Sequence, residues 1–389
     1  MKSSRHTDTP AAGEEFVTMY VAFELGKAQW KLGILLSGSS KLSRYVVAGG
    51  DIEAAWALIS KARAKAQKRS GKPVRIVSCY EAGYDGFWLH RELVARGVEN
   101  RVIDPASIEV NRRARRAKTD RLDLEHLIRV LIRHEGGEPR VCSVVRPPSV
   151  EQEDARRPWR ERERLVRERT AHVNRIKGLL HGQGVRDLQP RAREFREQLK
   201  AARSGDGHAL PPHLLAEIGR EHDRLRLVET QIAEIEAQAR AARAAAEPDT
   251  MMARINQLID LKGLGPVSAQ LLAGEVFWRD FQNRRQVGAY FGLTGTPYDS
   301  GQRVREQGIS KAGNARARSM AVELGWLWQR NQPDSALSRW FHERVGNQKG
   351  RLRRIAIVAL ARKLMVALWR FLEHGMVPEG AVLRAAARG

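Results

Sequence analysis

The chain has 389 residues, which is long for one average domain and indicates two or three, each with its own core. Its 68 Lys and Arg residues against 45 Asp and Glu residues give a formal net charge of +23, which predicts a polyanionic partner, first of all nucleic acid. The two cysteines form no CxxC pair or Cys/His cluster, which argues against a zinc site and favours a reducing cytoplasm. Without a signal-peptide core, an uninterrupted apolar span or a basic amphipathic terminus, the sequence predicts a cytoplasmic protein and no membrane partner.

The first third of the chain predicts an α/β layer. The segment 20–36 is typical of two strands around a turn, and further strands are expected at 44–47, in VRIVSCYEAG and in VENRVID. Helices are expected at 54–68, 85–96 and 120–134. Strands followed by strand-helix alternation indicate a mixed sheet. The Pro-rich segment 141–150 is predicted to be a linker.

Two charged helices are expected next. An apolar stripe marks the first, at 151–180, and a second helix carries apolar residues whose spacings of three and four are those of a coiled-coil seam: Leu225, Val228, Ile232, Ile235, Ala239 and Ala242. The pair fits an antiparallel hairpin or a dimer interface equally well. From Met251 onward, shorter helices with Gly turns predict a third, all-helical module that ends in an amphipathic helix at 353–372.

Four acidic residues fall where a metal-dependent nuclease needs them, namely Glu24 in the first strand, Glu81 at the end of a central strand, and Asp120 and Asp123 on one face at a helix start. Converging carboxylates are the ligands that Mg²⁺ requires for phosphoryl chemistry. Taken alone, the two aspartates are also a common helix cap. A basic run just before them predicts phosphate contacts or a solvated loop: Arg112, Arg113, Arg115, Arg116 and Lys118.

A second candidate site lies in the C-terminal third. LKGLGPVSAQ is typical of a helix-hairpin-helix, in which Gly263 and Gly265 form the turn and free N–H groups bind phosphate; an ordinary turn is the alternative. Ser300 precedes Gly301 in a polar turn, and Ser310 is the second serine to consider. Several polar and basic residues follow that would contact phosphates: Arg303, Arg305, Lys311, Asn314, Arg316 and Arg318.

Motifs from both halves resemble one family. YEAGYDGFWLHRELVARG, KTDRLD, LKGLGPVSAQLLAGEV, FGLTGTPYDSGQ and GISKAGNARAR occur in the order found in DEDD transposases of insertion sequences, the insertion-sequence "one-ten" group, whose members are guided by a bridge RNA. The resemblance extends from about residue 17 to about residue 375. It departs from the family pattern in having Glu24 in place of Asp, which changes how far the carboxylate reaches, and Asp299 before Ser300.

The resemblance implies a RuvC-like, RNase H-type domain at 17–140, a helical coiled-coil region at 150–247 and a serine-bearing domain at 251–375. It implies that Glu24, Glu81, Asp120 and Asp123 bind Mg²⁺, and that Ser300 attacks a phosphodiester and forms a transient phosphoserine link to DNA. It further implies donor and target DNA and a structured bridge RNA as partners, and a homo-oligomer, dimer or tetramer, with a site composed from two protomers. A hydrolytic nuclease such as a junction resolvase, or a non-catalytic nucleic-acid-binding protein, are the alternatives.

Overall fold

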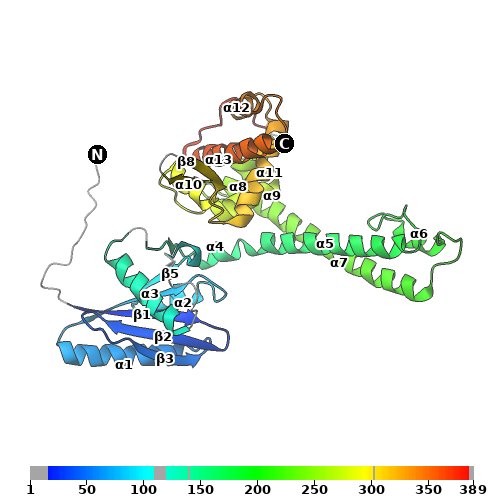
Figure 1. Cartoon of the computed structure of the whole chain (residues 1–389). Helices are drawn as coiled ribbons and strands as arrows, with labels where there is room; N and C mark the ends of the chain where they lie inside the picture. The colour runs from blue at the N-terminus through cyan, green and yellow to red at the C-terminus, as the bar shows by residue number, and fades with distance from the viewer. Residues whose placement is uncertain (1–15, 109–119, 139–140, 301–302, 385–389) are drawn as a thin grey trace. The chain divides into compact units, whose positions relative to one another are not determined.

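The structure is a computed structural model that describes residues 16–108, 120–138, 141–300 and 303–384. The chain divides after Ser149 into two compact units, each with its own hydrophobic clusters (Figure 1). None of the described helices combines the length and apolar character needed to cross a membrane.

The first unit is built on a mixed sheet, as the sequence predicts, and the sheet has six strands. Strands β1, β4 and β5 are parallel neighbours, while β2, β3 and β6 are antiparallel to the strands beside them, in the order β3-β2-β1-β4-β5-β6. The strands are β1 (Val17–Leu25), β2 (Gln29–Leu36), β3 (Ser43–Ala48), β4 (Val74–Glu81), β5 (Glu99–Ile103) and β6 (Val144–Val145). Central β1 and β4 are almost continuously apolar because helices cover both of their faces.

Helices lie on both faces of this sheet (Figure 1). On one face, α1 (Ile52–Ser70) and α2 (Trp88–Ala95) pack against a cluster that contains Phe23 and Tyr80. On the other face, α3 (Asp120–Glu135) packs against a cluster that contains Ala22 and Cys79. Gly33 in β2 lies under this helix, since a Cβ there would be in ordinary van der Waals contact with Leu124 and Ile128 at 3.7 Å.

The segment predicted to be a linker belongs in part to the first unit. Val144 and Val145 pair with Ile103 and Val102, and the Asp104 N–H donates to the Ser143 carbonyl oxygen at 2.9 Å. The prediction of a linker from residue 141 is therefore wrong for residues 141–145. The prolines that suggested it, Pro147 and Pro148, follow the strand rather than interrupt it.

An antiparallel helical hairpin begins the second unit (Figure 1). After the short α4 (Val150–Asp154), α5 (Arg157–His181) pairs with α7 (Pro212–Ala244), and α6 (Phe195–Ala201) lies between them in sequence. The predicted seam is buried at Leu225, Val228 and Ile232, whereas Ala242 is exposed. Of the two arrangements that the sequence allows, the seam is used here within one chain.

The remainder of the second unit surrounds the largest hydrophobic cluster. It comprises α8 (Met251–Asp260), α9 (Pro266–Leu271), the π-helical turn η3 (Leu272–Val276), α10 (Arg284–Tyr290), α11 (Ala315–Asn331), α12 (Ala336–Val345) and α13 (Arg351–His374). Between α10 and α11 the chain forms a β-hairpin, β7 (Gly295–Ser300) and β8 (Arg303–Ile309), so the prediction of an all-helical module is wrong. The sequence did not predict the hairpin because its two strands contain few apolar residues and so lack a clear strand pattern.

Candidate functional site

Two of the predicted acidic residues lie at the ends of neighbouring parallel strands. Phe23 of β1 and Tyr80 of β4 form the last pair of their ladder, and Glu24 and Glu81 follow directly. Because side chains alternate between the faces of a strand, Glu24 and Glu81 lie on the face opposite Phe23 and Tyr80, which is the face covered by α3. The strands thus bring the two carboxylates to one edge and one face of the sheet.

Helix α3 runs antiparallel to β4 and begins at this edge. At the far end, Glu135 forms ion pairs with Arg75 and Arg101 at 3.1 Å; further along, the Cys79 thiol lies 3.8 Å from the Leu127 carbonyl oxygen. From Leu127, Asp123 lies four residues toward the start of α3, a distance of about 6 Å along the helix. From Cys79, Glu81 lies two residues further along β4, a distance of about 6 to 7 Å in the same direction. Asp123 is therefore level with Glu81.

Asp120 opens α3, but its side chain lies outside the described part of the structure. Among the described residues there is no group of three or more His, Cys, Asp or Glu side chains arranged to hold a metal ion. The predicted four-acid Mg²⁺ site therefore stays a prediction. The basic run of residues 112–118 also lies outside the described residues.

Cys79 lies in β4 two residues before Glu81, and its side chain is buried in the cluster that packs against α3. Burial raises the pKa of its thiol far above the ordinary value, and the nearby Cys142 and Glu81 raise it further. A thiol held protonated in this way is neither a nucleophile nor a metal ligand.

Ser300 is the last residue of β7 and lies directly opposite Arg303 in the ladder, with Tyr298 opposite Arg305. The side chains of these four residues lie outside the described part. At the other end of the hairpin, the Thr294 hydroxyl donates to the Ser310 hydroxyl at 3.1 Å. The two candidate serines thus lie at opposite ends of the hairpin.

The predicted glycine turn connects α8 to α9. Gly263 has a φ of +97°, and a Cβ there would lie 2.7 Å from Cβ of Asn331, so the residue has to be glycine for packing alone. Gly265 caps α9 and is followed by Pro266 at the first helical position. The phosphate contacts predicted for these glycines stay a prediction.

Three further predicted residues surround the start of α11. Lys311 is exposed and has a φ of +56°. Asn314 caps the helix, its Oδ1 accepting from the Ala317 N–H at 3.1 Å. Arg316 forms ion pairs with Glu163 of α5 and, at 2.9 Å, with Glu275 of η3. In this arrangement Arg316 connects α5 to the C-terminal helices.

The ion pairs of Glu275 are the main polar feature that sequence reasoning missed. Arg160 of α5 donates two hydrogen bonds to Glu275, at 2.7 and 2.9 Å, and Arg156 stacks on Trp278 with its guanidinium carbon 4.2 Å from the ring centre. These contacts lie beside a cavity of about 510 Å³ between α5, α9 and α11. Nothing in the sequence spacing signals them, because Arg160 and Glu275 are far apart along the chain.

Comparison with known proteins finds similarity to transposases. Residues 255–339, which include the whole β7–β8 hairpin, match the family described as "Transposase IS116/IS110/IS902 family". Putative transposase y4rJ of Sinorhizobium fredii is 46% identical over 374 residues, 94% of this chain and 94% of that protein. The probable family 20 transposase of Pseudomonas aeruginosa is 32% identical over 58% of this chain and 65% of that protein. The transposase for insertion sequence element IS1111A of Coxiella burnetii is 26% identical over 73% of this chain and 74% of that protein.

Proposed function

Because the chain belongs to the IS116/IS110/IS902 family of insertion-sequence transposases, we propose that it cuts and rejoins DNA through Ser300, assisted by a Mg²⁺-binding acidic site and guided by a structured RNA. The observation that carries this proposal is the convergence of Glu24, Glu81 and the start of α3 at one edge of the first sheet. Its mixed sheet, covered by helices on both faces, also supports an RNase H-like domain.

The donor set proposed for the acidic edge suits Mg²⁺, since it consists of carboxylate oxygens. Glu24, Glu81, Asp120 and Asp123 would hold the ion. When bound, Mg²⁺ would stabilise negative charge on the phosphate oxygens. The role of the chain itself is to fix these carboxylates: β1 and β4 set the spacing of the glutamates, and α3, held by Glu135 at its far end, sets the level of the aspartates.

In the proposed reaction the Ser300 hydroxyl oxygen attacks the phosphorus atom of a phosphodiester. A serine–phosphorus bond forms, the bond from phosphorus to the leaving sugar oxygen breaks, and the serine proton ends on that sugar oxygen. One phosphodiester replaces another, so strand exchange needs no ATP. Arg303, whose backbone lies directly opposite Ser300 in the ladder, would stabilise charge on the phosphate.

The α5–α7 hairpin is the proposed contact for the guide RNA. Helix α5 carries eight basic residues against three acidic ones. RNA duplexes are recognised mainly through their phosphates and 2′-hydroxyls, which suits a long, charged helix.

The test is a cleavage assay with purified protein, Mg²⁺, DNA spanning an element end and RNA transcribed from the non-coding flanks of the gene. The wild-type protein is expected to form a protein–DNA adduct on a denaturing gel, and Ser300→Ala to form none. Glu81→Gln is expected to lower the adduct yield by about 100-fold, in line with the loss of a group that stabilises transition-state charge. Glu92→Gln, on α2 and so on the opposite face of the sheet, is the matched control and keeps the yield.

Two results would contradict the proposal. Cleavage without an adduct, unchanged in Ser300→Ala, would identify a hydrolytic nuclease. Adduct formation that is insensitive to Glu81→Gln would remove the acidic edge from the reaction.

A further inference from the structure

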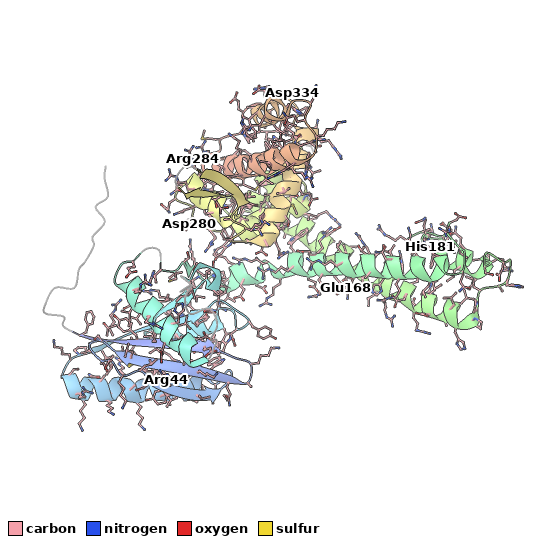
Figure 2. The ribbon with its side chains drawn as sticks, viewed as in Figure 1. Arg44, Glu168, His181, Asp280, Arg284 and Asp334 are labelled. Atoms are coloured by element: carbon pink, nitrogen blue, oxygen red, sulfur yellow. The ribbon has the colours of Figure 1, made fainter. Side chains whose placement is uncertain are left out.

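A wide groove in the second unit is lined by cations. It has a volume of about 1000 Å³ and lies between α10, the base of the β7–β8 hairpin and α13. Eight of its lining residues are basic and none is acidic: Arg284, Arg285, Lys311, Arg351, Arg354, Arg362, Lys363 and Arg370. Figure 2 labels Arg284 at the start of α10, beside this hairpin.

No described carboxylate balances the charge of the groove. Among the described residues, none of the eight cations forms an ion pair with a carboxylate, whereas arginines such as Arg160 and Arg75 do so elsewhere in the protein. Helix α13 contributes to the imbalance, since Glu373 is its only acidic residue. Gathered like charges repel one another unless an external anion neutralises them.

Helix α13 has one apolar face that packs in the core and one basic face that lines the groove. Leu360, Leu364 and Leu368 are fully buried in the core, while the cations recur on the other side, interleaved with Ile355 and Val358, which form part of the groove floor. From Arg351 to Arg370 the helix spans about 28 Å. Phosphates on one strand of B-DNA are spaced about 3.4 Å apart along the axis, so the row matches roughly eight of them.

We propose that this groove holds the sugar-phosphate backbone of the DNA strand that is presented to Ser300, and so sets where that strand is cut. Gly295 and Ile309, which pair at the base of the hairpin, line the groove, and Ser300 lies five residues further along β7. That separation is about 17 Å, or about five nucleotides of B-DNA. Phosphates held at the near end of the groove are therefore about five nucleotides from the cut. The inference rests on the proposed function only in using Ser300 as the cutting point.

The first test measures DNA binding and requires no chemistry. Arg354→Ala/Arg370→Ala removes two exposed cations, so the fold is preserved. In fluorescence anisotropy with an element-end duplex, the affinity is expected to fall about tenfold or more, and the slope of log affinity against log salt to decrease by about two. Arg354→Lys/Arg370→Lys keeps both charges and is expected to bind within a few-fold of wild type. The control, Arg330→Ala/Arg344→Ala, removes two exposed arginines that do not line the groove and keeps wild-type affinity.

The second test locates the contact. Single methylphosphonates, which are uncharged, are placed along the strand, and binding is measured with Ser300→Ala protein to prevent reaction. Affinity is expected to fall when the uncharged position is about five nucleotides from the mapped cut and beyond, and the Arg354→Ala/Arg370→Ala protein is expected not to respond.

Three results would overturn the proposal: unchanged DNA affinity in the double variant, a loss of affinity for the guide RNA alone, or sensitivity only at the scissile phosphate. The first two of these do not depend on whether an adduct forms. A protein that fails to form the serine adduct but responds as expected here would retain the groove and lose the serine chemistry.

Discussion

Glu275 is nearly buried in the π-helical turn η3, with a side chain 9% exposed, and accepts hydrogen bonds from arginines of two helices, Arg160 and Arg316. Burial alone would raise the pKa of this carboxyl. The hydrogen bond from Arg160 and the charges of Arg160, Arg316 and Arg156 more than offset that effect and hold the pKa below its ordinary value. The ion pair therefore stabilises the folded state whenever Glu275 is ionised.

Replacing Glu275 with Gln is expected to lower the free energy of unfolding of the second unit by about 2 kcal/mol at neutral pH, because it leaves partly buried guanidinium groups without their carboxylate. The folded pKa lies below the unfolded one, so this contribution is complete above the unfolded value of about 4.3 and is lost as the pH falls through the folded pKa. Denaturant unfolding at several pH values should show the gap between wild type and Glu275→Gln closing in acid.

Glu247→Gln is the control for this measurement, because Glu247 is exposed just after α7 and its side chain forms none of the ion pairs described. It should unfold like wild type throughout. A gap that stays constant with pH would mean that Glu275 acts through packing rather than through its charge.

At the scale of elements, the α5–α7 hairpin depends on a narrow seam of buried residues. Leu225 is fully buried, while Leu227, two residues away on the same helix, is 58% exposed. A buried carboxylate adds to the seam: Glu221 of α7 accepts from His172 at 2.7 Å and from Arg175 and Arg224 at 3.0 and 2.6 Å. The two leucines thus offer a matched pair for measuring the seam.

Leu225→Ala is expected to lower the free energy of unfolding by about 2 to 4 kcal/mol, because it leaves a cavity between the helices. Leu227→Ala removes the same atoms from an exposed position and is expected to cost less than about 0.5 kcal/mol. Thermal unfolding monitored by circular dichroism would compare them. Equal losses in the two variants would show that the hairpin is not held by this seam.

Several elements follow from local pattern and were predicted well. Periodicity and apolar runs predict the strands and helices of the first unit and the α5–α7 seam, because each of these buries a regular face. Glu24 and Glu81 lie at strand ends as the sequence indicates, and the sheet supplies the register that the sequence alone does not give. The four-acid site built on them stays a prediction.

The rest depends on contacts between distant segments. The β7–β8 hairpin has only Val304 and Ile309 as apolar signals in its second strand, and η3 differs from an α-helix only in how its backbone is bonded. The cations of α13 were visible in the sequence as interruptions of an apolar stretch. Their function as a groove wall depends on α10 and Lys311, which are brought beside them only by the fold.

At the scale of the whole molecule, the two proposed sets of reacting groups belong to different units: the acidic edge to the first, Ser300 to the second. The family resemblance implies a site composed from two protomers. If so, a chain that has lost its acids can still use its serine with the acids of its neighbour.

An equimolar mixture of Glu81→Gln and Ser300→Ala proteins is therefore expected to recover activity that neither has alone. With random pairing in a two-fold dimer, half of the dimers are mixed and each has one intact site, so about a quarter of the wild-type adduct is expected. The adduct should form only on the Glu81→Gln chain, which a size tag on one protein would reveal. No recovery after co-refolding would place both sets of groups in the same protomer.

The ion pairs that join Arg160 and Glu163 of α5 to Glu275 and Arg316 have a mechanical consequence. Helix α5 has 25 residues and is about 37 Å long. Its first turns are fixed to η3 and α11 by these ion pairs, while its last turn lies at the tip of the hairpin. Helix α5 is thus held at its first turns, and a tilt of about 5° there moves its other end, at the tip of the α5–α7 hairpin, by about 3 Å. A force on the tip of the α5–α7 hairpin is therefore transmitted through these four charged side chains to η3 and α11.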